Sequence, residues 1–273
     1  MKPDAPPHSA ARPAGPAFGR ALMRERGHFT WVYLWSAPIR AMHWLAAACI
    51  VVLVVTGFYI GRPYFITTGE ASAHFAMGWV RFIHFTAAAV LVMTGIVRVY
   101  WLFAGNRFER LPALFPVSPR NLRNLARTGI AYATFRPEKQ PNFVGHNPLQ
   151  QYSYTGIYLL TAAMVVTGFT LYGQSNPDGL IFRALRWLPP LLGGLQGVRF
   201  IHHVLTWGFI LFAILHVYFA IRSDYVERAG GVSSIFTGGR YIPTDETYED
   251  YDVSAVPARD WPTNERASPA RTP

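Results

Sequence analysis

Four long apolar blocks dominate the pattern of hydrophobic and polar positions along this chain. Each runs for about 20 residues with almost no charge, and a helix of that length crosses roughly 30 Å of hydrocarbon at about 1.5 Å per residue. The blocks predict four transmembrane helices, at about 42–60, 82–104, 153–172 and 200–221. The fold class that we expect is all-α, an integral membrane four-helix bundle.

The segments outside the blocks are more polar and differ from one another. After Pro119, apolar residues recur at helical spacing with Arg on the other face, which predicts a helix on the cytoplasmic membrane surface. Residues 1–27 and 241–273 are rich in Pro and lack helical periodicity, so we expect a disordered cytoplasmic N-terminal extension and a disordered cytoplasmic tail. Residues 28–240 then form one transmembrane domain.

The formal net charge of +10 would suit a nucleic-acid partner, but the basic residues lie where membrane topology needs them. Residues 1–40 carry six Lys or Arg against two acids, and the 105–150 connection carries seven against two. The connections at 61–81 and 174–199 hold only two and three Arg. By the positive-inside rule, both termini and the 105–150 connection are cytoplasmic. We therefore expect a multi-pass protein in contact with membrane lipids and no nucleic-acid partner.

The chemistry of the apolar blocks comes from histidine, not cysteine. The single cysteine, Cys49, allows no disulfide, no iron–sulfur cluster and no covalent haem attachment within this chain. Five of the nine histidines lie in predicted spans, where ionisable groups are costly and are therefore functional candidates. They are His43, His84, His202, His203 and His216.

The spacing of these histidines predicts two haem sites. His202 and His216 are fourteen residues apart, which returns to nearly the same helix face about 21 Å further along the axis. From His203 the interval is thirteen, far off one face, so His203 is treated as a neighbour. The span directions place His84 and His202 near the periplasmic face, and His43 and His216 near the cytoplasmic face. A single membrane histidine would equally suit an interfacial role, but the matched depths favour two haems b with bis-histidine ligation, His84 with His202 and His43 with His216.

Charged and small residues near these histidines are candidates for contacts with the cofactor. Arginine precedes three of the histidines by one helical turn, where a haem propionate would emerge. Arg98, fourteen residues after His84, is placed to pair with a propionate of the cytoplasmic haem. The alternatives are snorkelling for the arginines and close helix packing for the glycines. The predicted cofactor-binding residues are Arg40, Arg81, Arg98, Arg199 and Gly57.

Two short sequences occur twice. Val80-Arg-Phe-Ile-His84 recurs at 198–202, and Val-Val-Thr-Gly-Phe occurs at 54–58 and at 165–169. Either an old duplication or the shared requirements of equivalent helices would produce such repeats.

Several motifs together resemble a known family. With RAMHW at 40–44, VRFIHF at 80–85, GHNPL at 145–149 and RFIHH followed by LHVYFAI at 199–221, the chain resembles the b-type cytochrome subunit of membrane-bound nickel-iron hydrogenases. The resemblance covers roughly residues 29–240 and extends to di-haem cytochrome b561-like and formate dehydrogenase gamma-like proteins. In that family the histidines matching the four assigned above ligate the haems.

The resemblance implies an electron-transfer subunit of a hydrogen:quinone oxidoreductase complex in the bacterial inner membrane. The large subunit of a nickel-iron hydrogenase would oxidise hydrogen in the periplasm, and iron–sulfur clusters of its small subunit would pass electrons to the haem of His84 and His202. The haem of His43 and His216 would reduce quinone. The alternatives are the cytochrome b subunit of a formate dehydrogenase or other periplasmic oxidoreductase, and a non-redox membrane anchor.

The quinone site is expected just before the third span. There, His146, Asn147 and Gln150 offer hydrogen-bond donors to a quinone carbonyl beside the cytoplasmic haem. The alternative is a helix-capping turn, because Asn147 followed by Pro148 is a good pair for the first positions of a helix.

Overall fold

The computed structural model describes residues 29–64, 69–70, 74–115, 119–134, 141–227, 230–244 and 246–252. Four long helices make up most of this part: α2 (Ala37–Gly61), α3 (Ala76–Ala104), α6 (Pro148–Gly173) and α9 (Leu195–Glu227). All four are long and apolar enough to cross a membrane, so the predicted transmembrane helices and the all-α fold class are confirmed. The expected disordered segments at 1–27 and 253–273 lie outside the described residues.

The long helices extend beyond the predicted spans, and in α2 and α6 polar and proline residues set where the helix begins. α2 begins at Ala37, after Ser36 in an extended conformation and with Pro38 in the first turn. Proline is tolerated there because the first N–H groups of a helix have no acceptor within it. At the start of α6, the Asn147 side chain accepts from the Gln150 N–H and the Gln150 side chain accepts from the Asn147 N–H. This capping box confirms Asn147 as the N-cap residue of α6.

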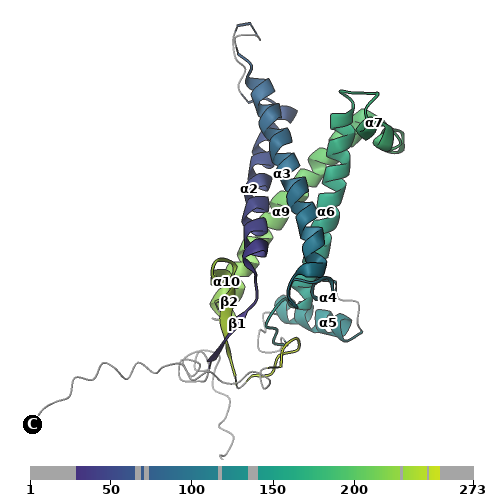
Figure 1. Ribbon diagram of the computed structural model, residues 1–273. Coiled ribbons are helices and arrows are strands. Elements are labelled where there is room, and N and C mark those ends of the chain that lie inside the picture. Colours follow the sequence, from purple (N-terminus) through teal and green to yellow (C-terminus); the bar gives the residue numbers. More distant parts are fainter. Residues whose placement is uncertain are drawn as a thin grey trace, which may run out of the picture.

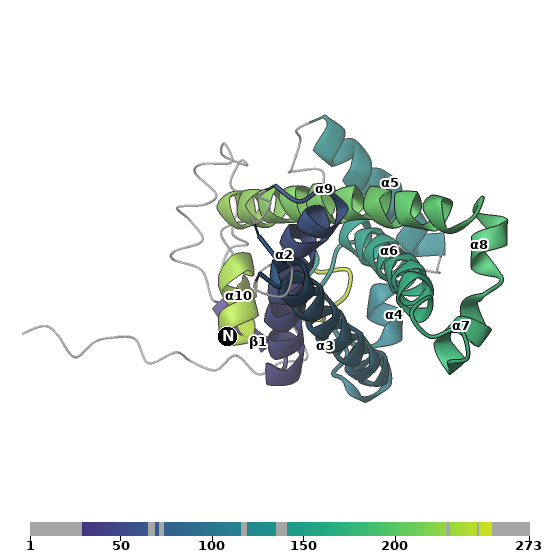
Figure 2. The same cartoon turned by 90° about the horizontal axis from the view of Figure 1, so that it is seen from above.

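The four long helices form two antiparallel hairpins. α2 packs against α3, α6 packs against α9, and α2 also contacts α9. Figures 1 and 2 show α9 strongly tilted against the other three long helices. Large apolar side chains cover the outer faces, and Phe103 and Leu159 are more than 65% exposed. Such faces are unfavourable in water but match a hydrocarbon surrounding, as expected for an integral membrane protein.

The two ends of the bundle carry different structures (Figure 1). We call one the ribbon end; it carries an antiparallel two-stranded ribbon and three shorter helices, namely β1 (Phe29–Tyr33), β2 (Gly239–Pro243), α4 (Leu111–Leu114), α5 (Pro119–Ala133) and α10 (Gly231–Thr237). The opposite end, the α7 end, carries α7 (Leu180–Leu185) and α8 (Leu188–Leu191). α2 and α6 run from the ribbon end to the α7 end, and α3 and α9 run back.

A small buried core stabilises the ribbon end. It consists of Val32, Leu34, Phe108, Val144 and Ile242, with Tyr248 and Tyr251 packed against it. The tail predicted to be disordered from residue 241 therefore starts too early, since β2 runs to Pro243 and residues 246–252 contact this core. The sequence did not reveal this ordered segment, because β1 and β2 are about 200 residues apart in the chain and pair only in the folded protein.

The predicted surface helix is present as α5. Its buried positions, Asn124, Thr128 and Ala131, recur at helical spacing and belong to the face that packs on the bundle, where α5 contacts α6. Leu122 and Ile130 are about 60% exposed. The exposed side of α5 carries these apolar residues together with Arg123 and Arg127, a mixture that suits a helix at a membrane surface.

Candidate functional site

At the ribbon end, one predicted histidine pair faces inward from two helices. His43 of α2 and His216 of α9 have ring centroids 6.2 Å apart, with ring planes at 52°. An imidazole nitrogen lies about 1.1 Å from its ring centroid and binds a metal at about 2.0 Å, so two rings on opposite sides of one ion have centroids about 6 Å apart. The Nδ1 atom of His43 is buried and has no hydrogen-bond partner within the described residues. The pair has the spacing that a shared metal ion requires.

At the α7 end, His84 of α3 and His202 of α9 form the second pair. Both imidazoles are half-buried. The Nδ1 atom of His84 is 2.8 Å from Thr56 Oγ1 on α2, and that of His202 is 2.8 Å from Thr167 Oγ1 on α6. The structure thus brings His43 and His216 together at the ribbon end and places His84 and His202 at the α7 end, with α9 contributing a histidine at each end.

Glycines beside this second pair leave room for the imidazole rings. A Cβ atom added to Gly57 would lie 3.4 Å from His84 Cε1, and one added to Gly168 would lie 3.2 Å from His202 Cε1. Gly57, predicted to contact the cofactor, thus lies against the ring of a predicted ligand. At Gly208 the neighbour is the Leu160 side chain, 3.2 Å from an added Cβ, which agrees with helix packing there.

His203 is not part of either pair. It is exposed, and its ring makes an edge contact with Phe58 of α2, with ring centroids 6.4 Å apart.

Two of the four arginines have partners inside the protein. Arg40 donates to the carbonyl of Phe236 in α10. Arg98 donates from Nε to the Tyr158 hydroxyl at 3.1 Å and from its terminal nitrogens to the Glu109 carbonyl. The lone charge in the α3 span is therefore already hydrogen-bonded by the chain itself.

The other two arginines, Arg81 and Arg199, are exposed at the α7 end. Neither guanidinium has a hydrogen-bonded or ionic partner among the residues that the structure describes. Each lies one helical turn from a paired histidine, and both are free to pair with an anionic group there.

The predicted quinone residues separate in the structure. The side-chain oxygens of Asn147 and Gln150 accept hydrogen bonds within the capping box, which leaves their side-chain NH2 groups as donors. His146 packs between Trp35 and Tyr154, with ring centroids at 4.7 and 4.6 Å. Its Nδ1 atom is buried without a hydrogen-bond partner in the described part of the chain.

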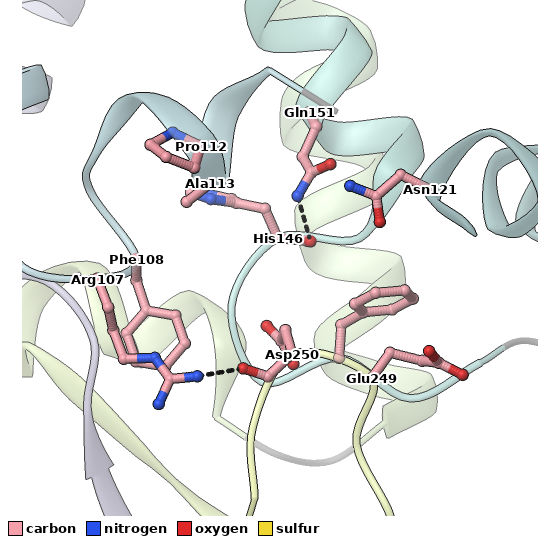
Figure 3. A pocket seen from close by; sticks show the side chains of 10 residues that line it. Arg107, Phe108, Pro112, Ala113, Asn121, His146, Gln151, Glu249 and Asp250 are labelled. Atoms are coloured by element: carbon pink, nitrogen blue, oxygen red, sulfur yellow. Dashed lines mark hydrogen bonds between the residues drawn. The ribbon is translucent and has the colours of Figure 1, made fainter. Parts of the chain in front are cut away.

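A pocket of about 240 Å³ lies beside His146 (Figure 3). Its lining comes from the 105–115 segment, α5, the start of α6 and the C-terminal segment; the residues include Arg107, Phe108, Asn121, Gln151 and Asp250. Burial, together with the positive charges of Arg98 and Arg240, lowers the pKa of His146 to about 3. The imidazole is therefore neutral at physiological pH and can act as a hydrogen-bond donor or acceptor.

Several residues that shape these sites were missed by the sequence reasoning. Thr56 and Thr167 lie at equivalent positions of the repeated Val-Val-Thr-Gly-Phe sequence, so the repeat was the signal that pointed to them. Glu109 is almost fully buried and accepts hydrogen bonds from the Ser36 N–H and the Trp101 indole. Its only sequence signal is an acid within a basic connection, which is too weak to assign a role.

Comparison with known proteins gives consistent matches. A family model described as prokaryotic cytochrome b561 matches residues 34–238. The chain is 40% identical over 210 residues to the probable Ni/Fe-hydrogenase B-type cytochrome subunit of Cupriavidus necator, covering 76% of this chain and 86% of that protein. It is 36% identical over 239 residues to the protein of the same name from Bradyrhizobium diazoefficiens, covering 87% and 95%. The probable Ni/Fe-hydrogenase 1 B-type cytochrome subunit of Escherichia coli K12 is 33% identical over 212 residues, covering 76% and 90%.

Proposed function

Because this chain belongs to the prokaryotic cytochrome b561 family, whose model spans both histidine pairs, we propose that it is the haem-carrying membrane subunit of a nickel-iron hydrogenase and passes electrons to quinone. The observation that carries the proposal is the approach of His43 and His216, whose ring centroids are 6.2 Å apart, together with His84 and His202 at the opposite end of the bundle. His43 with His216 would hold one haem b, and His84 with His202 the other. Two opposed imidazoles suit an iron ion whose remaining ligands come from a porphyrin.

The protein's own residues would orient and separate the two cofactors. When bound, each haem would take up and release one electron by changing its iron between the ferric and ferrous states. α9 sets the distance between the sites, because His202 and His216 lie fourteen residues apart, about 21 Å along the helix. Arg81 and Arg199 are placed to neutralise propionates at the α7 end.

The partner is inferred from the relatives. Their names assign them to nickel-iron hydrogenases, and the same assembly is proposed here, with small and large hydrogenase subunits on the α7 end. The basic ribbon end would face the cytoplasm of a bacterial cell by the positive-inside rule. Electrons would then enter at His84 and His202 and leave at His43 and His216.

The pocket beside His146 is the proposed quinone site. It lies at the same end as His43 and His216. Trp35, which packs on His146, is one residue before the N-cap of α2, the helix that carries His43. A neutral imidazole with an unpaired Nδ1 offers a hydrogen-bonding group to a quinone carbonyl, and Phe108 and Phe143 offer apolar surface to its ring. Asn147 and Gln150 fix the start of α6 through their side-chain oxygens, and neither lines this pocket.

Hydrogen-driven reduction tests the assignment. The chain would be purified with hydrogenase subunits from its own membranes, and the haem α-band would be followed after hydrogen is added and again after a soluble quinone is added. We expect reduction by hydrogen and re-oxidation by quinone. Haem that dithionite reduces but hydrogen does not would contradict the proposed partner.

A variant of His146 distinguishes the quinone site from the path by which hydrogen reduces the haems. His146→Leu should slow re-oxidation by quinone at least tenfold while leaving reduction by hydrogen unchanged. His74→Leu, an exposed histidine at the α7 end, is the control for the histidine change. Equal quinone rates in His146→Leu and the unchanged protein would remove this pocket as the quinone site.

A further inference from the structure

We propose that Thr56 and Thr167 are positioning residues for the iron ligands at the α7 end: each accepts a hydrogen bond from Nδ1 of a histidine and so presents Nε2 to the iron. Thr56 would hold His84, and Thr167 would hold His202. The inference rests on the proposed function, since it assumes that these histidines bind haem iron.

The direction of each hydrogen bond follows from the other contacts of the threonine. Thr56 Oγ1 lies 2.6 Å from the Val52 carbonyl oxygen and 2.8 Å from His84 Nδ1. A carbonyl oxygen only accepts, so the threonine proton is directed to Val52 and Oγ1 accepts from His84 Nδ1–H. A neutral imidazole carries one N–H, so the lone pair of His84 is on Nε2.

The same set of contacts occurs independently at His202. Thr167 Oγ1 lies 2.8 Å from the Ala163 carbonyl oxygen and 2.8 Å from His202 Nδ1. The threonine again donates to its own helix and accepts from the imidazole. His202 therefore has the same tautomer as His84, with Nε2 free for a metal.

The repeated sequences now have a structural explanation. In each hairpin, the Thr-Gly of the first helix meets the histidine of the second, and both threonines are buried, Thr56 at 9% and Thr167 at 4% exposure. The glycine after each threonine leaves the space that the ring occupies. The Val-Val-Thr-Gly-Phe and Val-Arg-Phe-Ile-His repeats are thus two copies of one histidine-holding arrangement.

The chemical consequence is a more basic ligand. A hydrogen bond accepted from Nδ1–H fixes the ring orientation and raises the electron-donating strength of Nε2, and losing such a partner commonly weakens metal binding 10- to 100-fold. A stronger donor stabilises ferric over ferrous iron. Removing either threonine hydroxyl should therefore raise the reduction potential of the haem at the α7 end and leave the other haem unchanged.

The test compares potentials in the full chain. Thr56→Val and Thr167→Val remove the acceptor and keep the size, whereas Thr56→Ser and Thr167→Ser keep it. Thr170→Val is the matched control, because Thr170 is buried one turn further along α6 and its hydroxyl donates only to the Val166 carbonyl at 2.8 Å. If a valine variant does not assemble, the alanine variant replaces it.

Redox titration and the electron paramagnetic resonance of the ferric protein give the result. We expect a more positive potential and a changed low-spin signal for one haem in the Val variants, and unchanged values in the Ser variants and in Thr170→Val. Val variants that behave like Thr170→Val, or Ser variants shifted as far as Val, would overturn the inference.

The outcome also distinguishes this inference from the function on which it rests. Two haems in the unchanged protein with no shift in the Val variants would refute the role of the threonines alone. If the wild-type protein contains no haem, both the proposed function and the role of the threonines are refuted.

Discussion

The two histidine pairs are held in different ways. At the α7 end, each imidazole is hydrogen-bonded to a buried threonine of the neighbouring helix. At the ribbon end, His43 Nδ1 has no partner in the described residues, and the rings pack against aromatic side chains, His43 edge-on to Trp44 and His216 stacked on Phe212 at 5.5 Å. The histidines at the α7 end are oriented by direct hydrogen bonds, and those at the ribbon end by packing and by the position of their helices.

The ribbon end supplies that position through a network around Glu109. The buried carboxylate accepts from the Ser36 N–H at 2.6 Å, the Trp101 indole at 2.8 Å and the Asn106 N–H at 3.1 Å. The Asn106 side chain in turn donates to the Leu34 carbonyl. These bonds connect the start of α2 to the end of α3. Ser36, where the network meets α2, is seven residues before His43. The Glu109 network thus helps to hold the histidines at the ribbon end in position, as the threonines hold those at the α7 end.

The largest expected effect is the loss of one haem when a single ligand is removed. His84→Ala and His202→Ala should each reduce the haem content by half and remove the same spectral component, and His43→Ala and His216→Ala should remove the other. Haem extraction with optical spectra measures both. His203→Ala, which changes the exposed neighbour, should keep both haems. Loss of the same component from His84→Ala and His43→Ala would break the assignment of the pairs.

The next effect is on stability at the ribbon end. Glu109→Ala would leave three part-buried donors without this acceptor, and an unsatisfied buried donor costs about 1–3 kcal/mol, so the free energy of unfolding should fall by about 3 kcal/mol. Thermal unfolding in detergent measures this, with Glu70→Ala, an exposed acid at the α7 end, as the control. The haem of His43 and His216 should be lost first on heating. Equal loss of both haems would show that the network serves the whole bundle.

Acid should affect the ribbon end through His146. Its pKa in the folded protein is about 3, below the ordinary value of 6.5, so folding favours the neutral ring. Its contribution is complete above pH 6.5 and is lost as the pH falls toward 3, by up to about 1.4 kcal/mol per pH unit. In unfolding measurements from pH 7 to 4, His146→Leu should lose less stability than the unchanged protein. Parallel pH profiles would contradict a neutral buried His146.

A smaller effect is expected at the C-terminal segment. The Asp250 carboxylate accepts from the Val144 and Gly145 N–H groups, both at 2.7 Å, and so connects this segment to the loop before His146. Asp250→Asn keeps one acceptor oxygen and should cost about 1 kcal/mol. The thermal midpoint should drop slightly and quinone re-oxidation should change, with haem content unaltered. A change at the haem of His84 and His202 would show that the two ends are coupled.

Much of the bundle could be predicted because its signals are local. Uninterrupted apolar runs fix the four spans, and span direction predicts that His43 lies at the level of His216, where the two rings meet. The ribbon could not be predicted, because β1 and β2 pair across the whole chain and neither strand has an alternating pattern of its own.

The second layer of the site was hidden for a different reason. Threonine in an apolar helix ordinarily donates to its own backbone, as Thr94 and Thr170 do. Only the packed structure shows that Thr56 and Thr167 also meet a histidine. Likewise, Asn147 and Gln150 had the residue types of a ligand site, and only the structure shows that their side-chain oxygens accept within the capping box.

The central claim is that each histidine pair holds one haem b. A haem count with a reduced-minus-oxidised optical spectrum of the purified intact chain tests it most directly. The account predicts two b-type haems per chain, both low-spin with two histidine ligands. One haem, or none, would contradict it.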